Sequence, residues 1–98
     1  MTRWVLGADA ALDLTRLTDF LTSKLPEDAY ETIDIVLSAL EILTRHPKVG
    51  RPVTHGLREL VISRGSSGYL ALYQYDDAQD LALVLRVRHQ RESGYLEL

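Results

Sequence analysis

Hydrophobic residues recur at three- and four-residue spacing through the first half of the chain, which is the period of an amphipathic helix. The pattern predicts a helix over residues 10–25, capped by Asp9, and a second helix that begins at Pro26 and ends with Arg45 and His46 in its last turn. The first apolar stripe is Leu14, Leu17, Leu21 and Leu25, opposite the polar Asp13, Arg16 and Asp19; the second is Ile33, Val36, Leu37, Leu40 and Leu43. Because the connection at Pro26 is short, we expect an antiparallel helical hairpin.

After Gly50 the hydrophobic period becomes two-fold, which predicts β-strands. We expect three of them, joined by the turn-rich segments RGSSG and DDAQD, and a shorter strand near the N-terminus. The expected strands are Trp4–Leu6, Leu57–Ser63, Tyr69–Tyr75 and Leu81–His89. The sequence therefore predicts an α+β fold of order βααβββ, with the helical hairpin packed on one side of an antiparallel meander. A chain of 98 residues has room for one core, so we expect a single domain over residues 1–98.

The last predicted strand alternates so regularly that its two faces are expected to differ. Leu81, Leu83, Leu85 and Val87 are assigned to the core face, and Ala82, Val84, Arg86 and Arg88 to the opposite face. On this interpretation Arg86 and Arg88 point away from the core.

The overall net charge of −3 hides a difference between the two halves of the chain. Residues 1–44 carry three basic and eight acidic side chains, whereas residues 45–98 carry eight basic and six acidic ones. The C-terminal half therefore suits an acidic protein or a ribonucleoprotein as partner, but its excess is too small for strong direct binding to DNA. The sequence has no cysteine, no apolar signal segment at its start and no bilayer-length apolar run, so we expect a cytoplasmic protein without a membrane partner.

Several polar clusters have simple structural interpretations. Asp76, Asp77 and Asp80 are expected to form a turn, because no glycine or distant glutamate completes a calcium loop. The histidines lack the spacing of a metal-binding pair, and the serines lack a nucleophile-elbow context; these residues are His46, His55, His89, Ser63, Ser66 and Ser67. The segment Gly65–Gly68 joins strand to strand, without the following helix that a phosphate loop needs. We therefore expect no metal and no cofactor.

Two groups of residues leave functional alternatives open. Tyr69, Tyr73 and Tyr75 share one strand face and could stack on bases, although a half-buried aromatic ladder under the helices is the favoured interpretation. The basic group lies on strands or strand ends that the meander brings together, and it consists of Arg58, Arg64, Arg86, Arg88, His89 and Arg91. Its guanidinium groups could clamp carboxylates or phosphates, or form a solvated face with local pairs such as Arg91 with Glu92.

Residues 49–95 resemble the RelE/ParE superfamily of type II toxin–antitoxin toxins, whose fold matches the predicted order of elements. The resemblance rests on GRP at residues 50–52, GLREL at 56–60, the Tyr69–Tyr75 strand and VRHQRE at 87–92. RelE-type members are ribosome-dependent endoribonucleases, and the resemblance implies that such chemistry would use Arg91 and Tyr95 here. The position where those ribonucleases carry an arginine is Leu70, which can neither stabilise a phosphorane nor activate a hydroxyl.

The HQRE ending is more similar to ParE-type members, which poison DNA gyrase in plasmid-stabilisation systems and are neutralised by a ParD-like antitoxin. The resemblance implies a protein that acts by binding rather than catalysis, without a cofactor. The expected partner-binding residues are Arg58, Arg64, Arg86, Arg88, His89, Arg91 and Tyr95, with Leu96 and Leu98 as apolar anchors. The alternatives are a ribonuclease that acts on ribosome-bound messenger RNA, and a non-toxic binding module on the same fold.

Overall fold

The computed structural model describes the backbone of residues 1–24, 26–64, 67–92 and 94, and their side chains except those of residues 21, 23, 24, 26–30, 63, 64 and 67. The elements are β1 (Arg3–Leu6), α1 (Ala8–Lys24), α2 (Pro26–Leu40), the 3₁₀ helix η1 (Glu41–Thr44), β2 (Arg51–Pro52), the 3₁₀ turn η2 (Thr54–Gly56), β3 (Arg58–Arg64), β4 (Ser67–Asp76) and β5 (Leu81–His89). The predicted α+β order of one strand, two helices and a three-stranded meander is confirmed, and the short β2 is added to it.

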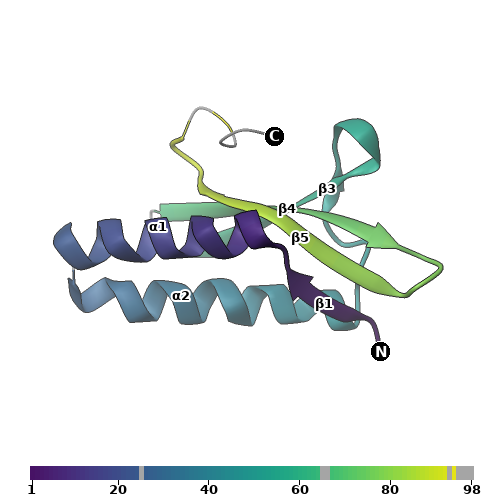
Figure 1. The fold of residues 1–98 in the computed structure, drawn as a ribbon, viewed down its shortest axis with the longest axis horizontal. Helices are drawn as coiled ribbons and strands as arrows, with labels where there is room; N and C mark the ends of the chain where they lie inside the picture. Colours follow the sequence, from purple (N-terminus) through teal and green to yellow (C-terminus); the bar gives the residue numbers. More distant parts are fainter. Residues whose placement is uncertain (25, 65–66, 93, 95–98) are drawn as a thin grey trace.

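The helices α1 and α2 lie side by side along one face of the sheet (Figure 1). Leu14 and Leu17 of α1 and Val36 and Leu40 of α2 are buried, so these members of the predicted apolar stripes do form the helix–sheet contact. The side chain of Leu21 and the whole of Leu25 lie outside the described residues. The predicted end of the second helix is wrong, because α2 stops at Leu40 and the chain tightens into η1. Arg45 and His46 therefore follow the 3₁₀ helix and do not lie in the last turn of α2.

The five strands form one sheet in the order β1-β5-β4-β3-β2. The pairs β2–β3, β3–β4 and β4–β5 are antiparallel, as the meander requires. In contrast, β1 lies parallel to β5, with Arg3 opposite Leu81 and Leu6 opposite Val84. The helical hairpin thus carries the chain away from β1, and the last strand returns beside the first.

A β-bulge corrects the predicted faces of β5. Tyr73 pairs with Val84 and the preceding Leu72 pairs with Arg86, so Leu85 is an extra residue without a partner in the register. A bulge of this kind shifts the alternation of side chains by one position. Before the bulge the helix-facing residues are Ala82 and Val84, both fully buried, contrary to the prediction; after it Val87 faces the core, as predicted.

The tyrosines of β4 are core residues rather than a base-stacking platform. Tyr69 and Tyr73 are buried in the cluster between the helices and the sheet, and Tyr75 packs against its edge. The Tyr73 hydroxyl donates to the Pro47 carbonyl at 2.8 Å and accepts from the Gly50 N–H at 2.9 Å. A Cβ on Gly50 would lie 2.6 Å from the Tyr73 ring, so only glycine allows this approach. Burial raises the pKa of Tyr73, although the Gly50 hydrogen bond and the charge of Arg58 oppose it.

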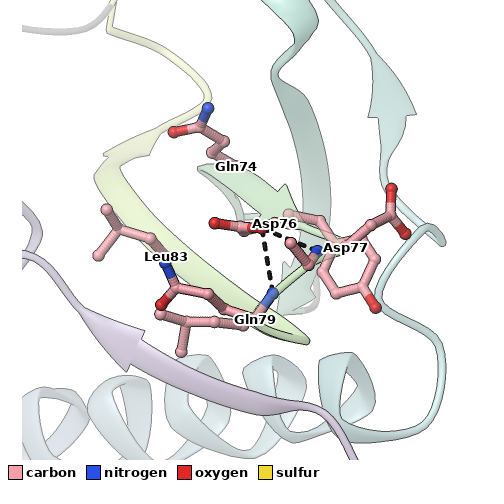
Figure 2. A pocket seen from close by; sticks show the side chains of 8 residues that line it. Gln74, Asp76, Asp77, Gln79 and Leu83 are labelled. Atoms are coloured by element: carbon pink, nitrogen blue, oxygen red, sulfur yellow. Dashed lines mark hydrogen bonds between the residues drawn. The ribbon is translucent and has the colours of Figure 1, made fainter.

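The DDAQD segment forms the turn between β4 and β5, as predicted. The Asp76 carboxylate accepts from the N–H groups of Ala78 and Gln79, and Figure 2 shows this turn beside the side chains of Gln74 and Leu83. The turn residues, together with Gln74 and Leu83, line a hollow of about 520 Å³ at the start of β5. This hollow lies at the opposite end of the strand from His89. Within the described ranges there is no cluster of side chains suited to a metal ion, and no described helix could span a bilayer.

Candidate partner-binding surface at the end of β5

The second half of β5 is joined to α1 through Asp13. Both carboxylate oxygens of Asp13 accept hydrogen bonds from Arg86, at 2.8 and 2.9 Å, and Oδ2 also accepts from the Val87 N–H at 2.9 Å. Because β1 pairs only with residues 81–84 of β5, this carboxylate takes the place of a neighbouring strand at Val87. Asp13 and Arg86 are 4% and 6% exposed, so this is a buried and geometrically complete ion pair.

The environment of Asp13 keeps it ionised. Burial by itself raises the pKa of this carboxyl group, but the hydrogen bonds from Arg86 and Val87 and the charges of Arg86 and Arg16 act more strongly in the opposite direction. The pKa of Asp13 therefore lies below its ordinary value. The pair is a fixed structural charge at neutral pH and not a proton donor.

A second ion pair joins α1 to the turn that follows β5. Arg16 donates to both carboxylate oxygens of Glu92, at 2.5 and 3.4 Å. Oε2 of Glu92 also accepts from the His89 N–H at 3.0 Å, and the Glu92 carbonyl accepts from Arg88 at 2.6 Å. Glu92 thus pairs with Arg16 of α1, and not with Arg91 as in the local pair considered from the sequence.

The remaining hydrogen bonds fold residues 89–92 into a compact turn. Nδ1 of His89 accepts from the Arg91 N–H, the His89 carbonyl accepts from the Glu92 N–H, and the Gln90 N–H donates to the Gly68 carbonyl, at 2.9–3.0 Å. The His89 ring meets the Tyr69 ring edge to face, with centroids 5.2 Å apart. The backbone of Arg91 is therefore fixed while its side chain is exposed.

The structure separates the predicted basic residues into different roles. The expectation that Arg86 is available to a partner on an outward face is wrong, because its guanidinium is buried against Asp13. Arg58 donates to the carbonyl groups of Lys48 and Gly50 and so holds the loop before β2. Arg88 and His89 are half-buried at the end of β5, and Arg91 is exposed in the turn that follows. The side chain of Arg64, and Tyr95, Leu96 and Leu98 entirely, lie outside the described residues.

The sequence-based reasoning missed Asp13, Arg16 and Glu92 as parts of this surface. It placed Asp13 and Arg16 on the solvent face of the first helix. However, Asp13 lies three residues after the buried Ala10 and four before the buried Leu17, so its helical spacing puts it on the apolar face. An acidic residue within such a stripe indicates a buried partner, but the spacing does not indicate that the partner is Arg86.

Comparison with known proteins finds a matching family model and a related toxin. Residues 5–94 match the family model described as the ParE toxin of the type II toxin–antitoxin system parDE. The chain is also similar to Toxin RelE3 of Caulobacter vibrioides, with 39% identity over 88 residues that span 89% of this chain and 92% of that protein.

Solved structures show the same fold. The chromosomal ParDE system from P. aeruginosa has a chain with a TM-score of 0.76 and 22% identity, over 91% of this chain and 96% of that one. A chain of the RelBE2 toxin–antitoxin complex from Mycobacterium tuberculosis has a TM-score of 0.60 and 26% identity, over 91% and 98% of the two chains. A chain of the E. coli RelBE complex has a TM-score of 0.55 and 16% identity, over 94% of this chain and 100% of that one.

Proposed function

The chain belongs to the ParE toxin family of type II toxin–antitoxin systems, and from this premise we propose that it inhibits DNA gyrase by binding and that a ParD-like antitoxin neutralises it. The observation that carries the choice of gyrase is the apolar middle of the sheet. Leu70 occupies the place where the related ribonucleases have an arginine, is only 8% exposed and lies opposite Arg88 in the register. Phosphodiester cleavage needs groups that move a proton and stabilise developing charge, and leucine supplies neither.

The proposed contact with gyrase uses the surface at the end of β5. Arg86 and Arg58 are engaged in holding the fold, so they contribute positive potential and not direct contacts. Arg91 is exposed and has no hydrogen bond or ion pair from its side chain to any residue within the described ranges. A guanidinium group in this position suits a carboxylate on an acidic partner surface. Arg91, with the neighbouring Arg88 and His89, is therefore the proposed centre of recognition, with Arg64 and Tyr95 as further candidates.

The antitoxin is the second proposed partner. The ParDE and RelBE structures that share this fold are named as toxin–antitoxin systems or complexes. An antitoxin with an amphipathic helix and an extended segment suits two features of this chain, namely the exposed apolar side chains Leu12 and Phe20 on α1 and the part of β3 beyond its short pairing with β2. Binding there would leave the core unchanged and cover surface that is otherwise in contact with water.

The gyrase proposal is tested by incubating the purified protein with supercoiled plasmid, with and without gyrase. Gyrase-dependent cleaved complexes are expected, and Arg91→Ala is expected to raise the toxin concentration required by about tenfold, because truncating an interfacial arginine typically costs 1–2 kcal/mol. Arg45→Ala is the matched control, since Arg45 is also exposed but follows η1, far along the chain from β5. It should leave the potency unchanged. Absence of cleaved complexes at saturating toxin would contradict the gyrase proposal.

A ribonuclease remains the second candidate function, because the relative at 39% identity is named RelE3. This candidate predicts cut messenger RNA in a translating extract, and its cleavage should require Arg91 and Tyr95. Protein that is inert in both assays and harmless when expressed without an antitoxin would instead support a non-toxic binding module.

A further inference from the structure

The turn at residues 89–92 lies at the edge of the hydrophobic core and depends on charged contacts. The buried cluster continues along β5 as far as Val87 and includes Tyr69, Ala71 and Tyr73 of β4. Beyond Val87, Arg88 and His89 still pair with β4, and the Gln90 N–H donates to the Gly68 carbonyl. The rest of the turn is held by the contacts of Glu92 and by the packing of His89 on Tyr69. Such peripheral segments open locally without unfolding the domain. The conformation of this turn can therefore change while the fold remains.

Glu92 is the centre of the contacts that fix the turn. Its carboxylate accepts from Arg16 of α1 and from the His89 N–H, and its carbonyl accepts from Arg88. The side chains of Arg16 and Glu92 are 37% and 29% exposed, so the pair is partly protected from water. A two-bond guanidinium–carboxylate contact in such a position is stronger than an isolated surface ion pair. Within the described ranges, Arg16 supplies the only hydrogen bonds to Glu92 that come from outside the C-terminal segment.

We propose that Arg16 is a positioning residue: by holding Glu92 against α1, it orders the turn at residues 89–92 and so fixes the site from which Arg91 meets its partner. This inference rests on the proposed function, because it assumes that Arg91 recognises the target. Arg16 itself does not touch the target. It acts through Glu92, whose carboxylate also accepts from the His89 N–H and whose carbonyl accepts from the Arg88 guanidinium.

The structural part of this inference is tested by hydrogen exchange at the amides of His89, Arg91 and Glu92. In Arg16→Ala these amides are expected to exchange roughly fivefold faster, because a partly buried charge-assisted contact is lost. Amides of Tyr73 and Val84, which lie in the core, should keep their exchange rates. Lys48→Ala is the matched control, since it removes an exposed ion pair with Asp77 at the other end of the sheet. Unchanged exchange at residues 89–92 in Arg16→Ala would overturn the inference.

The functional part is tested by the growth inhibition that follows expression without an antitoxin, which does not depend on the identity of the target. Arg16→Ala is expected to weaken inhibition about fivefold at equal protein level, and Arg16→Lys to restore most of it. Glu92→Gln should resemble Arg16→Ala, and the double variant should lose little more, because both changes remove one interaction. Additive losses, or full inhibition by Arg16→Ala despite faster exchange, would contradict the positioning role.

The two proposals fail in distinguishable ways. If the wild-type protein inhibits growth but produces no gyrase-dependent cleavage, the proposed target is wrong while the Arg16 series still reports on positioning. If the wild-type protein inhibits nothing, the proposed function is wrong, and the exchange measurement alone decides whether Arg16 orders the turn.

Discussion

Asp13 shows how one side chain can join two elements. It is buried, ionised and bound to both the guanidinium of Arg86 and the backbone of Val87. A buried ion pair gains little over an apolar pair of the same volume, but removal of one partner leaves the other charge buried without compensation. Asp13 is therefore required because Arg86 is present, and the two residues specify how α1 meets β5.

Asp13→Ala is expected to lower the free energy of unfolding by about 3–5 kcal/mol, because Arg86 loses its carboxylate partner and the Val87 N–H loses its acceptor. The measurement is urea unfolding at neutral pH. Asp19→Ala, which removes an exposed acidic residue of the same helix, is the control and should change stability by less than about 0.5 kcal/mol. Equal stability of the two variants would show that the Asp13 contacts contribute nothing.

The same residue gives the protein a pH dependence of known sign. Because the folded-state pKa of Asp13 is lowered, its contribution is fully present above the unfolded value of about 3.9 and is lost as the pH falls from there through the folded value. Urea unfolding repeated between neutral pH and pH 3 should therefore show a steeper acid loss in the wild type than in Asp13→Ala. Parallel curves would contradict the lowered pKa.

At the scale of elements, the bulge in β5 allows one strand to serve two neighbours. Before it, Ala82 and Val84 face the helices while the strand pairs with β1; after it, Val87 faces the core and its N–H meets Asp13. If Leu85 were paired within a regular ladder, uninterrupted alternation would place either Val84 or Val87 on the wrong face, because they are three residues apart. The bulge, which leaves Leu85 unpaired, therefore lets both valines face the core.

Deletion of Leu85 is expected to keep cooperative unfolding, because the flanking Val84 and Arg86 can stay paired with Tyr73 and Leu72, so that the buried side chains of β5 still face the core. Leu85→Ala keeps the register and should cost only about 1 kcal/mol, since this side chain is half-buried. Thermal unfolding followed by circular dichroism compares both variants with the wild type. Loss of the cooperative transition in the deletion variant would contradict the register that leaves Leu85 unpaired.

At the scale of the whole molecule, a small domain without cysteine is held by packing and by contacts between the two ends of the chain. β1 pairs with β5, Asp13 binds Arg86, and Arg16 binds Glu92. The two residues of each ion pair are at least 73 positions apart in the sequence. Apolar side chains remain exposed on α1 and β3, including Leu12, Phe20 and Val61. A partner that covers such surface stabilises the folded state by mass action.

The cognate antitoxin is therefore expected to raise the melting temperature of this chain by about 10–20 °C at a concentration 100 times its dissociation constant, which corresponds to about 2.7 kcal/mol. Thermal melts at increasing antitoxin concentration measure this shift. An antitoxin from an unrelated pair at the same concentration is the control. A melting temperature that does not depend on the cognate antitoxin would contradict its role as a partner of the folded toxin.

The local features of the fold were predictable because they depend on neighbouring residues. The spacing of Leu14 and Leu17, the break at Pro26 and the turn at Asp76 determine two helices and a hairpin from contacts only a few residues long. These features, together with the resemblance of residues 49–95, determined the α+β order and the toxin superfamily. Arg91 was one of several partner-binding candidates chosen from the sequence, and its role in binding remains a prediction.

The tertiary structure decided what depends on distant partners. Two-fold periodicity did not reveal the bulge, because the inserted Leu85 is apolar and fits the alternation of Leu81, Leu83 and Val87. Nor can it show that Arg86 is neutralised by Asp13, since the energy of that pair arises only when α1 and β5 meet. The sequence by itself thus determined the elements and the family, whereas long-range pairing decided that Arg58 and Arg86 hold the fold while Arg91 stays exposed to solvent.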